Sequence, residues 1–403
     1  MAPPTPAPAA GGPQAWPDEG LAEEYGLALS GGGIRAMLFH LGALWRLNEL
    51  GRLRTIDRIS SVSGGSFAAG LLALAWAELH WDERGRATDF EGQVARRILR
   101  VAGMRLDVPI ILLGIVPGIS ASKLLAAVLD RTSFHGRTLQ DLPAPGTGPR
   151  FVFNATDLAT GTDFRFSRPY MGSYRLGLVR HPTVRIADAV AASASFPPFV
   201  SPFPLHLDPA SVVAVPGADL HARRDLLGRV ALADGGVYDN LALEPVSGRC
   251  RVALVSDAGG NLSVEAGRWK WAFWTPQLKR TLDIAVSQSR ALRRRALGSA
   301  GDENPYAIWR TASDPTRYPA WPSCTFEVAP GWPEHLAGLS TRIWPFETSD
   351  RDHLVNWGYL MADLALRSFV WKDEPAPDSL PMSNATFETS PARQPVMAGG
   401  RDH

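Results

Sequence analysis

One serine in the sequence has the neighbours that a catalytic nucleophile needs. The segment Ser61-Val62-Ser63-Gly64-Gly65 ends an apolar run over 56–62 and precedes a second apolar stretch. A serine flanked by small residues between a strand and a helix is typical of the nucleophile elbow, a sharp and strained turn. We expect Ser63 to be the nucleophile, with Ser61 and Gly65 as its small flanks, because larger side chains at those two positions would collide.

Ser66 is the alternative nucleophile, because its flanking residues are also small. The strand predicted over 56–62 ends directly before Ser63, whereas Ser66 falls in a helix that the apolar spacing predicts from 66 to about 79. A nucleophile belongs at the turn itself, so the sequence favours Ser63.

A triple-glycine segment indicates a place where negative charge can be stabilised. Gly31, Gly32 and Gly33 stand between an apolar run over 25–30 and a helical stripe over 34–50. Backbone N–H groups at the start of a helix have no partners and attract anions, and glycines let a ligand approach the backbone closely. The segment suits a bound phosphate or the oxyanion of an acyl-transfer transition state.

A carboxylate that follows another predicted strand can serve as the base. Asp234 comes directly after the apolar run over 230–233 and precedes two glycines, so we expect it at the carboxyl edge of a sheet. A free aspartate has a pKa of about 3.9 and is a weak base near neutral pH, but burial would raise that pKa. Asp239 is the rival base, because it lies close to Asp234 in the sequence.

Strand and helix patterns alternate along the chain. Short apolar runs predict strands at 25–30, 56–62, 151–156, 162–167, 230–233 and 252–255. Apolar stripes predict helices at 34–50, 66–79, 90–103, 122–130, 184–192, 276–297 and 351–370. This order predicts a three-layer α/β/α fold with a mostly parallel central sheet and helical insertions.

Four blocks in this order resemble those of the patatin-like phospholipases. They are Gly31-Gly32-Gly33-Ile34-Arg35-Ala36, Ser61-Val62-Ser63-Gly64-Gly65, Ala192-Ser193-Ala194-Ser195-Phe196-Pro197-Pro198 and Asp234-Gly235-Gly236. The resemblance covers roughly 26–240, and Asn356-Trp357-Gly358-Tyr359 is similar to a C-terminal helix of bacterial members. Two positions depart from the family pattern, Ala36 at the end of the glycine motif and Ser61 in the elbow, and both replacements are small.

The resemblance implies a Ser–Asp catalytic dyad without histidine. Carried over residue by residue, Ser63 is the nucleophile, Asp234 the base, and Gly31–Gly33 with the following Arg35 form the oxyanion hole. It implies a serine-dependent lipid acyl hydrolase of phospholipase A or lysophospholipase type, which cleaves carboxylic esters of phospholipids or lysophospholipids through an acyl-enzyme. No metal and no organic cofactor is implied. The alternative is a catalytically idle lipid- or membrane-binding module of the same fold, against which the filled catalytic positions argue.

Three further alternatives concern the same or neighbouring residues. A Ser–His–Asp triad would take its histidine from His335 or His353, in keeping with the usual order of hydrolase triads. A dinucleotide fingerprint fits Gly31-x-Gly33-x-x-Ala36, but no acidic residue ends the second strand to bind the ribose. Asp157 and Asp163 fit a hairpin turn, and a metal role for them lacks a full ligand set.

The composition is that of a globular protein and excludes several classes. Of the 403 residues, 41 are Lys or Arg and 40 are Asp or Glu, so the net charge of +1 gives no general attraction to nucleic acid. Only Cys250 and Cys324 are present, which excludes a disulfide framework and a Cys-based metal site. Neither a secretion signal nor an apolar segment of roughly 18 residues is found, so we expect a cytoplasmic or peripheral membrane location.

The chain is expected to form one catalytic domain between two flexible ends. Residues 1–20 and 373–403 are rich in small residues and proline and predict a flexible leader and a flexible tail. The catalytic domain is expected to span 21–372, with a helical or lid insertion over 80–150.

Two segments indicate peripheral contact with a membrane, in addition to the lipid substrate. Trp269, Trp271 and Trp274 alternate with basic residues, a combination that favours the headgroup region of an anionic membrane. The uncharged stretch over 108–122 is too short to span a bilayer, but it fits an interfacial segment or lid, or alternatively a buried loop.

Overall fold

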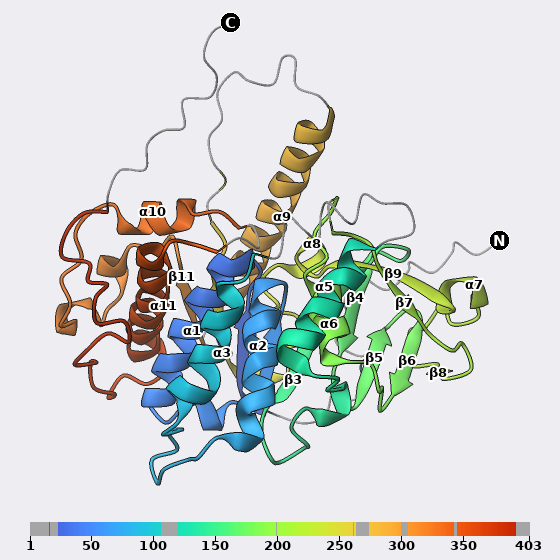
Figure 1. Cartoon of the computed structure of the whole chain (residues 1–403), viewed down its shortest axis with the longest axis horizontal. Helices are drawn as coiled ribbons and strands as arrows, with labels where there is room; N and C mark the ends of the chain where they lie inside the picture. The colour runs from blue at the N-terminus through green and yellow to red at the C-terminus, as the bar shows by residue number, and fades with distance from the viewer. Residues whose placement is uncertain are drawn as a thin grey trace, which may run out of the picture.

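The computed structural model describes residues 16, 23–105, 120–198, 200–260, 262, 274–299, 305–341 and 345–391 (Figure 1). Trp269, Trp271 and most of the 108–122 segment lie outside these ranges, and so does the side chain of Trp274. The membrane contacts expected for these residues therefore stay predictions.

One mixed sheet of eleven strands runs through the described part of the chain. The strands are β1 (Glu23–Leu29), β2 (Arg58–Ser61), β3 (Arg150–Asp157), β4 (Thr162–Phe166), β5 (Tyr170–Ser173), β6 (Gly177–Arg180), β7 (Phe203–His206), β8 (Val212–Val213), β9 (Arg229–Asp234), β10 (Cys250–Asp257) and β11 (Tyr306–Arg310). The strands β11, β10, β1, β2 and β3 are parallel neighbours in that order. Beyond β3, the strands β4, β5, β6 and β8 extend the sheet in antiparallel pairs.

The helices of the described residues fall between these strands. They are α1 (Gly33–Glu49), α2 (Gly64–Ala75), α3 (Arg96–Ala102), α5 (Ala121–Leu129), α6 (Ile186–Ser193), α7 (Arg224–Leu227), α8 (Gly236–Asp239), α9 (Trp274–Ser299), α10 (Trp332–Gly338) and α11 (Thr348–Phe369). Short 3₁₀ or π turns lie at Leu53–Thr55, Trp76–Glu78, Glu91–Ala95, Asp130–Phe134, Leu139–Asp141, Pro315–Arg317 and Trp321–Ser323. In Figure 1, α9 protrudes from the body on the side where α8 and α10 lie.

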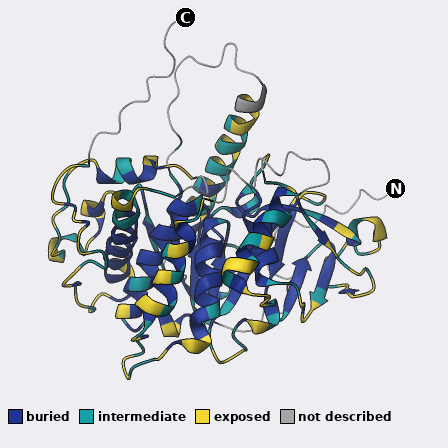
Figure 2. Ribbon diagram, in the orientation of Figure 1, coloured by how far each residue is buried: buried dark blue, intermediate teal, exposed yellow. Residues whose placement is uncertain are grey.

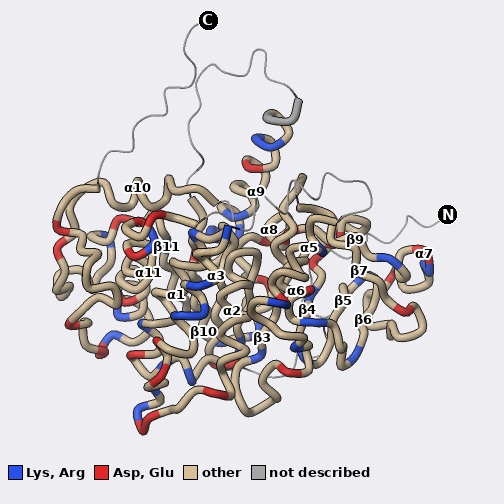
Figure 3. The backbone as a smooth tube through the Cα atoms, viewed as in Figure 1, with Lys and Arg blue, Asp and Glu red and all other residues tan. Residues whose placement is uncertain are grey.

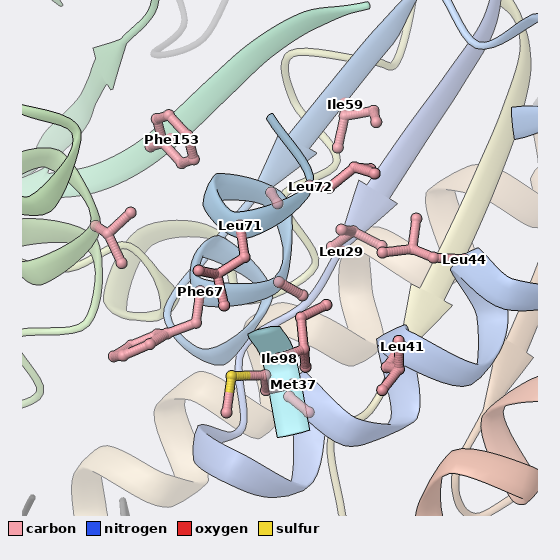
Figure 4. Packing of buried hydrophobic residues seen from close by; sticks show 14 of the residues in the cluster. Leu29, Met37, Leu41, Leu44, Ile59, Phe67, Leu71, Leu72, Ile98 and Phe153 are labelled. Atoms are coloured by element: carbon pink, nitrogen blue, oxygen red, sulfur yellow. The ribbon is translucent and has the colours of Figure 1, made fainter. Parts of the chain in front are cut away.

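The two faces of the sheet carry separate apolar clusters. Because side chains alternate along a strand, Leu254 of β10 belongs to the large core, whereas Val255 packs with Leu297 of α9 in a smaller cluster. Leu29 of β1 and Met37 of α1 both belong to the large core, part of which Figure 4 shows. The strands and the helices α1, α2 and α11 are largely buried (Figure 2). Helices therefore cover both faces, and the predicted three-layer α/β fold is confirmed.

The helix that follows the glycine segment is held against the C-terminal helix α11. A Cβ atom on Gly42 of α1 would overlap the carbonyl oxygen of Val355, and one on Gly358 of α11 would overlap the backbone of α1. Arg46 of α1 forms a buried ion pair with Asp363 of α11 at 2.8 Å. The two glycines thus allow α1 and α11 to pack closely, so a helix near the C-terminal end of the described residues holds α1 in place.

Strands β2 and β9 approach each other end to end along one edge of β3. The strand β2 pairs with β3 as far as Ser61, which lies opposite Phe153. The strand β9 runs antiparallel to β3 and pairs with the next part of the same edge, with Asp234 opposite Ala155. We expected Asp234 at the edge of a mostly parallel sheet, but the antiparallel direction of β9 points its last residue at the turn that holds Ser63.

The boundaries of 21–372 expected for the catalytic domain leave out residues that pack against it. Ala385 and Phe387, which belong to the expected flexible tail, are buried, and the Phe387 ring packs edge-on against Trp332. Trp16, in the expected leader, is buried and stacks on Tyr170. Packed chain therefore continues past residue 372, and one leader residue contacts the domain.

The described part of the 80–150 segment belongs to the main core. Ile98 of α3 and Leu125 of α5 are fully buried in the same cluster as α1 and α2. The described part of the segment therefore forms no separate body, and the interpretation of the segment as a lid stays a prediction. Among the described residues, no helix combines the length and the apolar character needed to cross a membrane.

Candidate active site

Ser63 occupies a sharp turn between β2 and α2. Its φ of 53° and ψ of −120° lie in a region that non-glycine residues adopt only at a cost in conformational energy. The strand ends at Ser61 and the helix begins at Gly64, so the chain changes direction over only two residues. Ser63 is half-buried. This strained strand-to-helix turn has the geometry that the elbow prediction requires.

The turn presses against the glycine segment and the backbone of β1. A Cβ atom on Gly64 would overlap the carbonyl oxygen of Gly33, and one on Gly65 would overlap the β1 backbone. The Ser61 side chain is accommodated, because its hydroxyl accepts a hydrogen bond from Ser66 at 3.0 Å. The collision that excludes a side chain at position 65 is therefore with β1, and not with residue 61 as we expected.

Asp234 lies against Ser63 in a buried position. The Ser63 hydroxyl lies close enough to the Asp234 carboxylate to lower its pKa, and the Gly236 N–H donates to Asp234 Oδ1 at 2.7 Å. Only 2% of Asp234 is exposed. Burial raises the pKa of Asp234 to about 6, and the Ser63 hydroxyl and the Gly236 N–H oppose that rise. At neutral pH the group is thus ionised, yet it is a stronger base than an exposed aspartate.

The C-terminal end of α6 positions both Ser63 and Asp234. The Asp234 N–H donates to the Ser195 carbonyl at 2.9 Å, and the Gly235 N–H donates to the Ser193 carbonyl at 3.2 Å. Ser193 Oγ accepts a hydrogen bond from the Ser63 N–H at 3.0 Å. The sequence marked this serine block through the family resemblance and as a proline-closed turn, but it did not show the role of Ser193, which depends on a contact 130 residues away.

Two amides of the glycine segment are free to bind an oxyanion, and one is not. The Gly31 N–H donates to the Asn240 carbonyl at 3.0 Å, so it is occupied, contrary to our expectation. The amides of Gly32 and Gly33 make no hydrogen bond to the described residues. Gly32 adopts a φ of 145°, which disfavours any side chain, and Gly33 begins α1. Of the three glycine amides expected to stabilise an oxyanion, only those of Gly32 and Gly33 therefore remain candidates.

The Arg35 side chain ties α1 to two other segments. Its Nη1 donates to the carbonyls of Ala337 at 2.8 Å and Leu339 at 2.7 Å, and its Nε donates to Ala258 at 3.2 Å. Arg35 is 2% exposed. Most of its donors are therefore occupied by backbone carbonyls, although Nη2 would lie 3.8 Å from a Cβ on Gly32.

Asn240 lies between the glycine segment and Asp234, and sequence reasoning missed it. A Cβ atom on Gly31 would overlap Asn240 Oδ1, and one on Gly236 would lie 2.5 Å from the same oxygen. The same position on Gly31 is 3.3 Å from Ser63 Cβ. These distances show that the Asn240 side chain lines the site. The only signal in the sequence was that Asn240 follows Asp234 closely.

The alternative catalytic residues are engaged elsewhere. Asp239 accepts hydrogen bonds from the amides of Leu241, Leu243 and Glu244, so its carboxylate stabilises the turn that follows it. Ser66 is buried in α2, where its hydroxyl contacts the hydroxyls of two other serines. Neither residue therefore takes the place that the structure gives to the Ser63–Asp234 pair.

The candidate histidines of a triad also have other partners. His335 Nε2 lies 2.9 Å from an oxygen of Asp350, and His353 Nε2 donates to the Thr386 carbonyl at 3.0 Å. His40 is buried between Ser256 and the Ser30 carbonyl, and burial lowers its pKa to about 4, which marks it as a neutral packing residue. The described residues thus supply no histidine for Ser63.

The hairpin carboxylates have structural partners. Asp157 accepts a hydrogen bond from Thr160 at 2.6 Å, and Asp163 pairs with Arg165 at 2.6 Å. Across the described ranges, no group of three or more His, Cys, Asp or Glu side chains is arranged to hold a metal ion. The hairpin interpretation of this segment therefore explains both carboxylates.

The chain matches the family described as Patatin-like phospholipase over residues 27–247. The matched part includes the glycine segment, Ser63 and Asp234, and it exceeds half of the chain. The chain belongs to the patatin-like phospholipase family.

Two solved structures are similar to this chain. The human GIVD cytosolic phospholipase A2 is 16% identical, with a TM-score of 0.39, over 60% of this chain and 46% of that chain. VipD from Legionella pneumophila is 15% identical, with a TM-score of 0.36, over 86% of this chain and 67% of that chain. The chain thus spans less than half the length of the human protein. No curated protein sequence matches it.

Proposed function

We propose that the protein hydrolyses the carboxylic ester bonds of phospholipids or lysophospholipids through a Ser63–Asp234 dyad. The observation that carries this proposal is the position of Ser63, on a strained turn, next to a buried carboxylate whose pKa burial raises to about 6. Serine is a poor nucleophile until a base accepts its proton. A buried aspartate of this kind can accept that proton near neutral pH without a histidine.

The proposed reaction proceeds in two steps. Ser63 Oγ attacks the ester carbonyl carbon while Asp234 accepts the hydroxyl proton, and the amides of Gly32 and Gly33 stabilise the oxyanion. Asp234 then returns the proton to the leaving alcohol, and the acyl group stays on Ser63. Water attacks the acyl-enzyme, Asp234 takes a proton from that water, and the fatty acid leaves as Ser63 regains its proton.

Product analysis on vesicles tests this proposal. Wild-type protein incubated with phosphatidylcholine or lysophosphatidylcholine vesicles should release free fatty acid, and Ser63→Ala should release none above background. Ser66→Ala is the matched control, because Ser66 is a buried serine three positions away, and it should retain most of the activity. Vesicle binding by the wild type without fatty acid release would favour the alternative, a catalytically idle lipid-binding module.

We also propose that the protein contacts the membrane peripherally through the tryptophan segment. The support among the described residues is the adjoining helix α9, where Leu278, Ile284 and Leu292 are 53%, 41% and 59% exposed. Exposed apolar side chains beside basic ones favour an anionic lipid surface. Co-sedimentation with anionic vesicles should fall at least several-fold when Trp269, Trp271 and Trp274 are replaced by alanine, and unchanged binding would remove this contact.

A further inference from the structure

A cluster of arginines surrounds one buried carboxylate at the carboxyl end of β10. Asp257, the last residue of β10, is fully buried. Arg294 Nη1 donates to Asp257 Oδ2 at 2.9 Å. Arg290 Nη1 lies 3.7 Å from Asp257 Oδ1, and Arg310 Nε lies 3.6 Å from Asp257 Oδ2. Arg290 and Arg294 come from α9 and Arg310 from the end of β11, and Figure 3 shows the basic segments along α9.

The cluster carries more positive charge than its carboxylate can balance. Arg35 is also close to the cluster: burial lowers the pKa of Arg35 to about 10, and the positive charge of Arg290 adds to that fall. Four guanidinium groups thus share the single carboxylate Asp257, an excess of three positive charges within the described residues. Charges gathered away from water are costly unless they are paired, so this arrangement calls for a further anion.

Two of the arginines keep donors without hydrogen-bond acceptors. The Nε atoms of Arg290 and Arg310 are buried and make no hydrogen bond to any residue in the described ranges. The Arg290 side chain is only 7% exposed, whereas those of Arg294 and Arg310 are 23% and 27% exposed. The cluster therefore combines unsatisfied buried donors with two partly open guanidinium groups that a ligand can reach.

The cluster lies beside the glycine segment, on the side of the segment away from Asp234. A Cβ atom on Gly259 would overlap the Arg290 guanidinium, and one on Gly32 would lie 3.3 Å from the Ala258 carbonyl oxygen. The sheet order places β10 on one side of β1 and β2 on the other. A ligand whose ester carbonyl sits at Gly32 can therefore extend an anionic group toward β10.

We propose that Arg290, Arg294 and Arg310 form a binding site for a phosphate-type anion next to the candidate active site. Arginine suits this ligand, because its planar guanidinium donates two parallel hydrogen bonds to phosphate oxygens. The assignment of that anion to the phosphate of an acyl lipid rests on the proposed function, whereas binding of the anion itself does not. The three arginines lie outside the 27–247 family match, so the site belongs to this chain's own C-terminal part.

Thermal unfolding in inorganic phosphate tests the site without any turnover. The wild type should gain several degrees in Tm on addition of inorganic phosphate at constant ionic strength, and Arg294→Gln and Arg310→Gln should lose most of that gain. Arg295→Gln is the matched control, because Arg295 is exposed on the same helix, and it should keep the gain. If the arginines only hold α9 in place, the two variants will lower Tm but leave the phosphate effect unchanged, which would overturn the proposal.

A second experiment distinguishes the phosphate of a lipid from a free phosphate as the ligand of this site. For the lipid source, Arg294→Gln should lower kcat/KM for phosphatidic acid relative to diacylglycerol by about tenfold or more, the loss expected for one charge-assisted hydrogen bond. For a free anion, that ratio should stay constant while the phosphate-dependent Tm gain is still lost. Ser63→Ala should keep the Tm gain, so failure of the catalytic proposal and failure of the anion site give different results. No Tm gain in the wild type would overturn the site.

Discussion

At the scale of single residues, the proposed chemistry depends on a carboxylate that is buried but still ionised. Burial raises the pKa of Asp234 to about 6, from an ordinary value of 3.8. At 1.36 kcal/mol per pKa unit, this shift disfavours the ionised form at neutral pH by roughly 3 kcal/mol. The protein thus retains at Ser63 a residue pair that costs stability, and such a cost is typical of functional sites.

Asp234→Asn should remove activity while preserving the fold. The amide can still accept the Gly236 N–H, but it cannot accept the Ser63 proton, so kcat should fall by about 10²- to 10⁴-fold. Unfolding of the variant in urea should give a free energy at pH 7 that is equal to or greater than that of the wild type, by up to roughly 3 kcal/mol. Asp225→Asn, at an exposed carboxylate, is the matched control. Near-normal turnover by Asp234→Asn would remove Asp234 from the mechanism.

The pH dependence should follow the ionisation of Asp234. As the base form is required, kcat/KM for a soluble ester should rise through about pH 6 and then stay level. The raised pKa of the folded state means that Asp234 favours folding most when protonated, so this contribution is lost as the pH rises from about 4 to about 6. Asp234→Asn should lack this loss. A kcat/KM profile that is flat across pH 6 would contradict the assignment.

At the scale of elements, part of the site was predictable from the sequence and part was not. The glycine segment, the elbow and Asp234 are each weak signals alone, but their order along the chain let the sequence point to them as candidates. The role of Ser193 and the position of Asn240 depend on contacts between distant segments. The occupied amide of Gly31 likewise depends on Asn240, which only the folded chain brings close. Local patterns therefore identify reactive groups better than the residues that position them.

The strands likewise divide into those that the sequence predicts and those that it does not. Runs such as β1 and β10 are long and apolar enough to be recognised as buried strands. The strands β5, β6, β7 and β8 have four residues or fewer, and they lie among polar turns, so their patterns are too short to predict. The direction of β9 was also beyond reach, because a single strand pattern carries no information on whether its partner is parallel or antiparallel.

Gly64→Ala should disable the elbow by moving it away from the glycine segment. The new methyl group would overlap the Gly33 carbonyl oxygen, so Ser63 and the amides at Gly32 and Gly33 could no longer keep their spacing. Because displacements of about 1 Å cost roughly 100-fold in rate, we expect a fall in kcat/KM of that order. Gly92→Ala is the control, as its Cβ meets nothing within 4 Å, and it should retain full activity. Equal activities of the two variants would contradict this account of the turn.

At the scale of the whole molecule, the site is assembled from segments far apart in the chain. The helix α1, which begins at the glycine segment, packs on α11 near the C-terminal end of the described residues. The family match ends at residue 247, so α9 and α11 lie outside the matched part, and α11 supports that part by packing on α1. The large buried core lets this arrangement hold a strained serine and a buried carboxylate together.

Gly358→Ala should destabilise the whole domain, although it lies far from the chemistry. A Cβ atom there would overlap the carbonyl oxygen of Phe39 in α1, and such overpacking costs about 1–3 kcal/mol. Chemical denaturation should show this loss of unfolding free energy, while the activity of the folded fraction stays close to that of the wild type. Gly338→Ala, where a Cβ meets nothing within 4 Å, should show neither effect. An unchanged stability of Gly358→Ala would mean that α1 and α11 are not packed so closely.

Covalent labelling with a fluorophosphonate probe tests the central assignment most directly. The probe reacts with a serine whose hydroxyl is activated by a neighbouring base, and peptide mapping by mass spectrometry then locates the adduct. We predict a single adduct on Ser63 in the wild type and in Ser66→Ala, no adduct in Ser63→Ala, and strongly slowed labelling in Asp234→Asn. An adduct on another serine, or equal labelling of the wild type and Ser63→Ala, would contradict the assignment of Ser63 as the nucleophile.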